Sequence, residues 1–431
     1  MAPPAMCILC VCILLGRFVA SLMGHSRLSS RERFQIQPAR ERFHPCLVTL
    51  MMGGSLLLFL MADVSWRAMP HASTRAQLLR TVAASLSLAG GARSIAGAAS
   101  VPRGGPVTPR SVEAIREWSA LPVWPAWPTP TSPTGGRVRP MSLAAVGGDP
   151  FLLLAHHRHS FSPGDPLRAP FKAVGGALGL PYVGDEGFAL HPHRGIDIWT
   201  YILDGSDGFR HKDSFGGDCI YRGGACQFMR SGKGAMHEEM WETRSDRPTQ
   251  VELFQLWVNL PRRQKMSEPA IRYLGDDWRA PYSRETLHDA RGMAVGTVRT
   301  LDAAVLESAG EGEGEVLHDR PPVALRHASL APGASWVAPV ESGHTAIAYL
   351  RRGAVQVNAQ VLGEVGPGST CTFRGDGDAI WLVNNGNVAA DVLLLTGAPL
   401  NEPIAMGGPI VMNSEEEVQQ AYADLRAGTF L

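Results

Sequence analysis

From residue 137 onward, short apolar runs alternate with clusters of Gly, Pro and Asp. A spacing of roughly ten residues between such clusters is typical of an all-β sandwich or barrel, in which each run forms one strand. In VELFQLWVNL (251–260), Leu253 and Trp257 point to one face and Phe254, Leu256 and Val258 to the other, so we expect a strand covered on both sides. The other clear strand sequences are IDIWTYIL, HTAIAYL, AVQVNAQVL, AIWLVNN and VAADVLLLTG.

These strands fall into two sets, one between about 140 and 290 and one between about 291 and 400, with the segment 311–322 as a loop inside the second set. A helix is predicted at the end of the chain, in NSEEEVQQAYADLRAG (413–428). Ser414 and Glu417 have the spacing of a capping box, and Gly428 is a natural C-terminal stop. Val418, Tyr422 and Leu425 (i, i+4 and i+7) predict the side that packs on a sheet. We therefore expect three regions: 1–135, a leader; 136–290, an N-terminal domain; and 291–431, a C-terminal domain ending in the helix.

The predicted leader has the composition of a targeting region. Two apolar runs, 6–22 and 46–62, resemble signal-peptide cores or marginal membrane spans. The stretch 64–112 has no acidic residue and is rich in Arg, Ala and Ser, as in organellar transit peptides, and 121–136 is a proline-rich linker. Two interpretations stay open. The leader directs the protein to an organelle, by a plastid or secretory route, and provides its only membrane contact; or translation starts later and the protein is cytoplasmic or nuclear.

Charge and cysteine content narrow the function classes. Forty basic and forty acidic side chains leave no net charge at pH 7, which argues against direct binding of nucleic acid. Of seven cysteines, only Cys219, Cys226 and Cys371 fall in the folded part. An odd number in a chain of this size argues against a disulfide framework.

Two short motifs carry the candidate chemistry. In HPHRG, His191 and His193 have the same parity and would face the same side of an extended segment. In GAMHEEM, His237 and Glu239 are related in the same way. A single pair of this kind is often incidental, but two pairs on neighbouring strands offer three imidazoles and one carboxylate to one ion. Such a set suits a divalent first-row metal, Fe(II) first, with Mn, Ni, Cu or Zn as alternatives, and it leaves two octahedral positions open.

For the other polar residues near these motifs we mainly expect structural roles. His156, His157 and His159 lie in the polar sequence AHHRH and are expected on a surface or a pocket rim. His211 lies between the two motifs, and we expect it in a loop, with a place beside the metal ligands as the alternative. For Asp197, a hydrogen bond to an imidazole and a purely structural role are equally open.

The motifs HPHRGIDIWTYILDG, HKDSFGG, SGKGAMHEEM and QLWVNLP resemble, in this order, the hallmark segments of pirins, a branch of the bicupin superfamily. The resemblance covers about 137–431, from DPFLLLAHHRHSF to GGPIVMNSEEEV. It implies two β-barrel (double-stranded β-helix, cupin) domains packed together, with a short C-terminal helix and a disordered leader. It also implies iron ligands at His191, His193, His237 and Glu239, and no metal in the C-terminal domain, where His318, His327 and His344 are isolated.

By the same resemblance, two functions remain open. One is a quercetin 2,3-dioxygenase, which opens a flavonol-like ring with O₂; Glu239 would be the catalytic base that deprotonates the substrate hydroxyl. The other is an iron-dependent, redox-responsive binding module or transcription co-regulator with protein partners and no turnover. In both cases we expect a monomer. The pirin turn before the third histidine is replaced here by RGGACQFM, and the connection 162–190 is longer than in pirins. We therefore expect the covering of the pocket, and with it the substrate, to differ from those of other pirins.

Overall fold

The computed structural model describes residues 107–123, 135–162, 187–274, 282–302, 322–358 and 365–431, which are mostly β-strand. The expected leader up to residue 106, the linker 124–134 and most of the loop 311–322 lie outside these residues. The same holds for most of the connection 162–190. No helix in the described part of the chain is long and apolar enough to cross a membrane.

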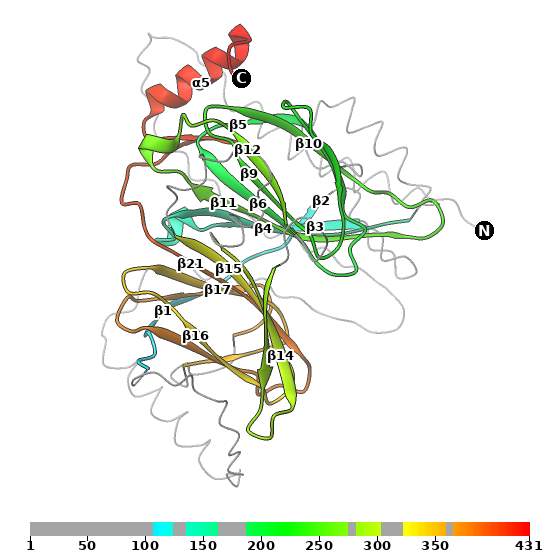
Figure 1. Cartoon of the computed structure of the whole chain (residues 1–431), viewed down its shortest axis with the longest axis vertical. Helices are drawn as coiled ribbons and strands as arrows, with labels where there is room; N and C mark the ends of the chain where they lie inside the picture. The colour runs from blue at the N-terminus through cyan, green and yellow to red at the C-terminus, as the bar shows by residue number, and fades with distance from the viewer. Residues whose placement is uncertain (1–106, 124–134, 163–186, 275–281, 303–321, 359–364) are drawn as a thin grey trace, which may run out of the picture. The chain divides into compact units, whose positions relative to one another are not determined.

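The N-terminal barrel consists of two sheets with antiparallel pairing (Figure 1, cyan and green). Two of its strands, β4 and β11, pair along ten residues and form the middle of the larger sheet. The seven-stranded sheet contains, in spatial order, β12 (Ala270–Leu274), β9 (Cys226–Arg230), β6 (Ile196–Ile202), β11 (Thr249–Asn259), β4 (Phe151–Phe161), β3 (Gly135–Ser142) and β2 (Leu121–Val123). The four-stranded sheet contains β5 (Gly187–His193), β10 (Ala235–Trp241), β7 (Phe209–Asp213) and β8 (Asp218–Tyr221). Two 3₁₀ turns, Ala144–Val146 and Arg262–Gln264, connect strands.

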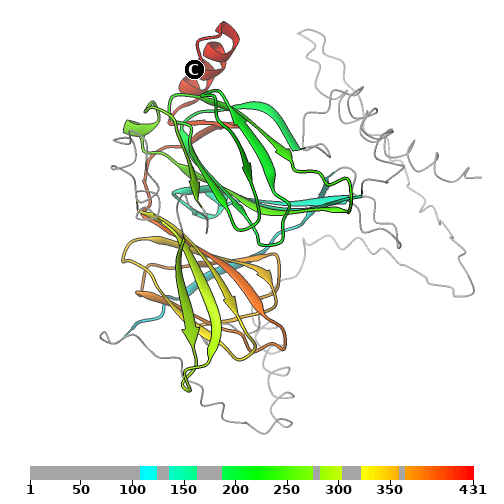
Figure 2. The same ribbon diagram turned by 45° about the vertical axis from the view of Figure 1, so that its right-hand side comes forward.

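The C-terminal barrel repeats this plan with a seven-stranded and a three-stranded sheet (Figure 2, yellow and orange). Its interior is a cluster to which both sheets contribute, with Trp336 and Leu382 from one and Val298 and Leu394 from the other. The larger sheet contains β1 (Val112–Glu117), β19 (Ser369–Phe373), β17 (Thr345–Arg352), β21 (Ala390–Gly397), β15 (Val323–Leu330), β14 (Ala294–Leu301) and β13 (Ser283–His288). The smaller contains β16 (Ser335–Pro339), β20 (Ala379–Val383) and β18 (Gln356–Val357).

Strands β1 and β2 correct the expected extent of the leader. The composition of the chain up to residue 135 predicts a leader and linker, whereas β1 pairs with β19 of the C-terminal barrel and β2 with β3 of the N-terminal barrel. Both strands lie at sheet edges, where backbone hydrogen bonds to a single neighbour suffice and no apolar alternation is required. Strand β13 (Ser283–His288) precedes the predicted boundary at 290/291 but pairs with β14 of the C-terminal barrel.

Most predicted strands are confirmed. Strand β11 is buried on both faces, as its sequence predicted, since Leu253, Phe254 and Leu256 are all inaccessible to solvent. AVQVNAQVL is an exception, because within its described residues only Gln356 and Val357 form a strand.

The C-terminal segment returns to the N-terminal barrel after the second barrel is complete. It forms the hairpin β22 (Ala405–Gly407) and β23 (Ile410–Met412), followed by helix α5 (Glu415–Ala427). The helix has the predicted capping box: Glu417 N–H donates to the Ser414 hydroxyl, and the Glu417 carboxylate accepts from the Ser414 N–H. Gly428 adopts the left-handed conformation (φ 74°) that ends the helix.

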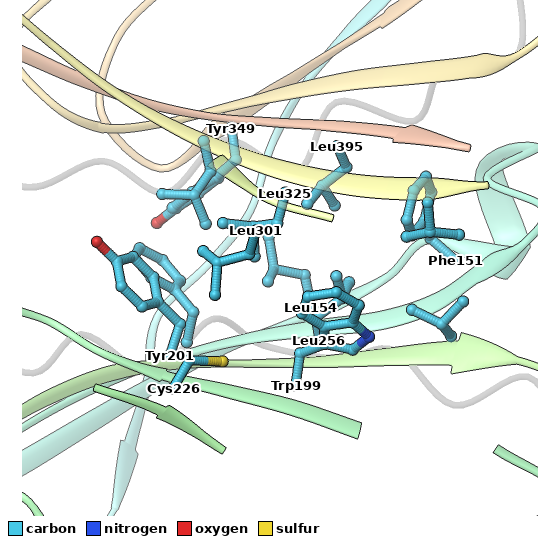
Figure 3. Packing of buried hydrophobic residues seen from close by; sticks show 14 of the residues in the cluster. Phe151, Leu154, Trp199, Tyr201, Cys226, Leu256, Leu301, Leu325, Tyr349 and Leu395 are labelled. Atoms are coloured by element: carbon cyan, nitrogen blue, oxygen red, sulfur yellow. The ribbon is translucent and has the colours of Figure 1, made fainter. Parts of the chain in front are cut away.

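One hydrophobic cluster joins the two seven-stranded sheets. In Figure 3, Trp199, Tyr201 and Leu256 from the N-terminal barrel approach side chains of the C-terminal barrel. The latter include Leu301, Leu325 and Leu395. The two barrels therefore share a buried interface, as the fold prediction of two packed all-β cupin domains required.

Candidate metal centre

Three histidines gather inside the N-terminal barrel. His191 and His193 lie at the end of β5, and His237 lies on the adjacent antiparallel strand β10, directly opposite His191. One ring nitrogen from each lies within 4.8 Å of the others, and the Nε2 atoms of His191 and His237 are 3.0 Å apart. The shared parity of His191 and His193 therefore has the structural result that the sequence analysis predicted: both rings reach one point.

Hydrogen bonds fix the orientation of two of these rings. Nδ1 of His191 lies 2.8 Å from the carbonyl oxygen of Ala189, and Nδ1 of His193 lies 3.3 Å from that of Pro409. A carbonyl oxygen can only accept, so each Nδ1 carries the proton and each Nε2 retains a lone pair. Nε2 of His193 has no hydrogen-bond partner among the described residues. Metal-ligating histidines usually have this arrangement, in which the outer nitrogen donates to a fixed acceptor.

Burial keeps the three imidazoles neutral. Desolvation lowers the pKa of His191, and it lowers the pKa of His193 and His237 well below the ordinary value of 6.5. For His237 the neighbouring histidines lower the pKa further. A neutral imidazole is the form that coordinates a metal ion, so the cluster does not need to lose protons to bind one.

Glu239 shares the face of β10 with His237 but does not belong to the three-histidine group. Its carboxylate is buried and accepts hydrogen bonds from the Thr200 hydroxyl (3.2 Å) and the Gln255 amide (2.9 Å). Burial raises its pKa to about 7, although both hydrogen bonds act in the opposite direction. The expected convergence of four side chains is therefore present for the three imidazoles, while the carboxylate lies in a separate hydrogen-bonded position.

The structure corrects the interpretation of His211. This residue lies on strand β7 rather than in a loop, it is buried, and its ring centroid is 5.3 Å from that of His237. Its Nε2 donates to the Asp213 carboxylate at 3.0 Å. The period-two pattern of FRHKD, with Phe209, His211 and Asp213 on one face, was the signal that could have identified it.

The three histidines of AHHRH are also buried, which corrects their expected place on a surface or rim. All three lie on β4. His157 and His159 share one face, with 3.2 Å between Nδ1 of the first and Nε2 of the second, and both contact Trp241. His156 contacts Tyr349 of the other barrel and Glu252 on the neighbouring strand β11 of its own barrel. A neutral imidazole can occupy an interior position when an aromatic ring or a hydrogen-bond partner is available, and each of these has one.

The turn that follows the first two histidines is held by the C-terminal segment. Arg194 donates to the Asp424 carboxylate (2.7 Å) and to the carbonyl oxygen of Phe430 (3.0 Å), and its guanidinium lies 4.3 Å from the Phe430 ring centroid. The buried Lys265 ammonium donates to the carbonyl oxygens of Gly195 (3.1 Å) and Val411 (3.0 Å). The histidine turn is thus fixed from two directions.

Asp197 has a structural role. Its carboxylate accepts two hydrogen bonds from the guanidinium of Arg230, at 3.0 and 3.2 Å, in a fully buried pair between β6 and β9. This ion pair favours the structural alternative over a hydrogen bond to a metal-site imidazole.

A fold of two packed β-barrels, with a three-histidine group in the first, has the architecture of a bicupin. Residues 147–258 match the family model described as Pirin, and residues 325–431 match that of the Pirin C-terminal cupin domain. The chain belongs to the pirin family.

Characterised relatives agree with this assignment. Human Pirin is 31% identical over 241 residues, which are 56% of this chain and 76% of that protein. A pirin-like protein of Caulobacter vibrioides is 33% identical over 253 residues, 58% of this chain and 82% of that protein. The crystal structure of quercetin 2,3-dioxygenase from Acinetobacter baumannii is similar with a TM-score of 0.57 and 26% identity, covering 75% of this chain and 99% of that one.

Proposed function

We propose that the N-terminal barrel binds one divalent first-row transition metal, Fe(II) first, through Nε2 of His191, His193 and His237. The observation that carries this proposal is the group of three neutral imidazoles, of which His193 and His237 are buried and His191 is partly buried. Two of them have the proton on Nδ1 because of a fixed carbonyl acceptor, so their lone pairs are available at one point. Imidazole donors suit Fe, Ni, Cu and Zn, so the residues present fit such an ion without selecting one.

Glu239 is our proposed fourth ligand. It lies two positions from His237 on the same face of β10, so a change of side-chain rotamer would bring the carboxylate toward the imidazole group. The move would exchange its hydrogen bonds from Thr200 and Gln255 for the ion. Coordination by three histidines and one carboxylate would leave two octahedral positions for other ligands.

The reaction that we propose is of the quercetin 2,3-dioxygenase type, with a flavonol-like substrate and O₂. The similar structure from Acinetobacter baumannii, which bears that activity in its name, supports this choice. When bound, the metal would supply Lewis acidity and a template for a chelating substrate. Glu239 would accept the proton of the substrate hydroxyl, and the buried positions of Glu239, His193 and His237 would limit the access of bulk water.

The test combines metal analysis with O₂ consumption. The full chain, loaded anaerobically with Fe(II), should bind about one ion per chain and consume O₂ when quercetin is added. Binding of the ion without O₂ consumption for quercetin or other flavonols would refute the enzymatic proposal. It would instead favour the iron-dependent binding module without turnover. Failure to bind any of the candidate ions would refute both functions.

A further inference from the structure

The N-terminal barrel has a cleft at the seam between its two sheets. The cleft measures about 510 Å³, and it is lined by residues of β7, β8 and β12. Strand β8 is the edge of the four-stranded sheet and β12 the edge of the seven-stranded sheet, and the two are not paired with each other. The volume is within the range of pockets that bury a small organic ligand, roughly 300–1,000 Å³.

Aromatic rings form one wall of this cleft. The rings of Tyr221 and Tyr273 are stacked across the seam, with centroids 5.0 Å apart and planes inclined by 20°. Tyr221 also contacts His211 edge-on, with 6.1 Å between ring centroids. Tyr221 is also stacked on Phe209, so both of its faces are covered within the protein. Of these two tyrosines, only Tyr273 is left to offer a ring face to a planar aromatic molecule in the cleft, with the His211 imidazole at one end.

His211 joins the cleft to the three-histidine group. It lines the cleft, and its ring also contacts that of His237. Asp213 fixes its tautomer: the carboxylate can only accept, so the proton of His211 is on Nε2 and Nδ1 is an acceptor. This Nδ1 is buried and has no hydrogen-bond partner among the residues that the structure describes. A buried acceptor of this kind favours a ligand that brings a donor.

We propose that this cleft is the binding site for a planar hydroxylated aromatic substrate. In the bound state, Nδ1 of His211 accepts a hydrogen bond from the substrate hydroxyl, and Tyr273, which is backed by Tyr221, contacts the ring system. The assignment of the substrate class rests on the proposed function. The assignment of the cleft and of the hydrogen bond rests on the side chains above. His211 is accordingly a specificity-determining residue that distinguishes a hydroxyl from its methyl ether.

The hydrogen bonds of Asp213 indicate a substitution that should invert the preference of His211 for a hydroxyl over its methyl ether. Oδ1 accepts from the backbone N–H groups of Phe215 and Gly217, and only Oδ2 accepts from His211. Asp213→Asn keeps an oxygen for the backbone and places an amide N–H opposite His211. Nε2 must then accept, the proton moves to Nδ1, and the imidazole presents a donor to the cleft instead of an acceptor.

The probes are 3-hydroxyflavone and 3-methoxyflavone, which differ at one hydroxyl. Both are titrated anaerobically into the metal-free full chain, with tryptophan fluorescence as the readout, so binding is measured without turnover. The control is Asp289→Asn. Asp289 Oδ1 also accepts from two backbone N–H groups, those of Arg291 and Met293, but Asp289 lies in the β13–β14 connection of the other barrel.

We expect the unmodified protein and Asp289→Asn to bind the hydroxyl compound about tenfold more tightly than the methyl ether, the effect of one buried hydrogen bond. Asp213→Asn should abolish or reverse that ratio, and Tyr273→Leu should weaken both probes without changing it. A folded Asp213→Asn protein with an unchanged ratio overturns the inference, as does absence of binding to the metal-free protein. Neither outcome affects the proposed function. That function is refuted only if the protein fails to bind the metal, or if the iron-loaded protein fails to consume O₂ with a flavonol.

Discussion

Glu252 joins the two barrels through a network of charges. It lies on β11 of the N-terminal barrel, and its carboxylate accepts two hydrogen bonds from Arg351 on β17 of the C-terminal barrel (2.8 and 2.9 Å). A third comes from Nε2 of His156 (2.9 Å), and Arg351 also donates to Asp391 (2.6 Å). Desolvation alone would raise the pKa of Glu252, but the hydrogen bonds from His156 and Arg351 outweigh it and lower the pKa to about 2.

The difference between 4.5 and about 2 corresponds to about 3 kcal/mol of folding free energy, at about 1.4 kcal/mol per pKa unit. The Glu252 side chain is 21% exposed, so solvent screens the interaction only in part. Because the folded pKa is depressed, this stabilisation is complete above about pH 4.5 and is lost as the pH falls toward 2. About 2 kcal/mol should disappear between pH 7 and pH 3.

The perturbation is Glu252→Gln, assayed by urea unfolding of the full chain at pH 7 and pH 3. At pH 7 the variant should be less stable than the unmodified protein by about 3 kcal/mol. At pH 3 the difference should shrink to about 1 kcal/mol, since most of the stabilisation that the variant lacks is then lost from the unmodified protein too. Glu268→Gln is the control, because Glu268 forms an exposed pair with Lys233 (2.7 Å) and should change stability little at either pH. An equal difference at both pH values would refute the assignment of the stabilisation to the ionised Glu252.

Three further predictions concern the metal centre and the terminal helix. His237→Ala should remove most of the bound metal, measured by mass spectrometry of the purified protein, whereas His327→Ala in the other barrel should retain it; equal metal content would contradict the proposed ligand set. Glu239→Gln should keep most of the metal and lose O₂ consumption, and full activity would end its role as base. Ser414→Ala should lower the free energy of unfolding by about 1 kcal/mol through loss of the helix cap, and an unchanged urea midpoint would speak against that contribution.

Local sequence patterns predicted the elements whose structure depends on residues close together in the chain. The capping box of α5 depends on residues three positions apart, and the two-sided burial of β11 depends on an apolar run, so both are visible in the sequence. Strand β1 carries no such pattern. It is an edge strand whose side chains are mostly exposed, and its pairing with β19 joins residues more than 250 positions apart.

The convergence of the candidate metal-binding histidines could be predicted from the sequence, whereas the positions of the side chains around them were harder to predict. Parity along an extended segment is sufficient to bring His191 and His193 to one point. The position of the Glu239 carboxylate depends on a rotamer and on Thr200 and Gln255, which no spacing rule reveals. The polar sequence AHHRH predicts exposed histidines on β4, whereas a neutral imidazole that packs beside an aromatic ring can be buried in a core.

The contact between His193 and Pro409 has a consequence for biosynthesis. The two residues are 216 positions apart, and the chain between them includes every strand of the C-terminal barrel except β1. When the first barrel has emerged from the ribosome, Pro409, whose carbonyl group orients this imidazole, has not yet been synthesised. Nor has Val411, whose carbonyl oxygen accepts a hydrogen bond from the same Lys265 ammonium group as that of Gly195. Under the proposed function, an ion could therefore bind in the final geometry only after both barrels had been translated and the tail had folded back.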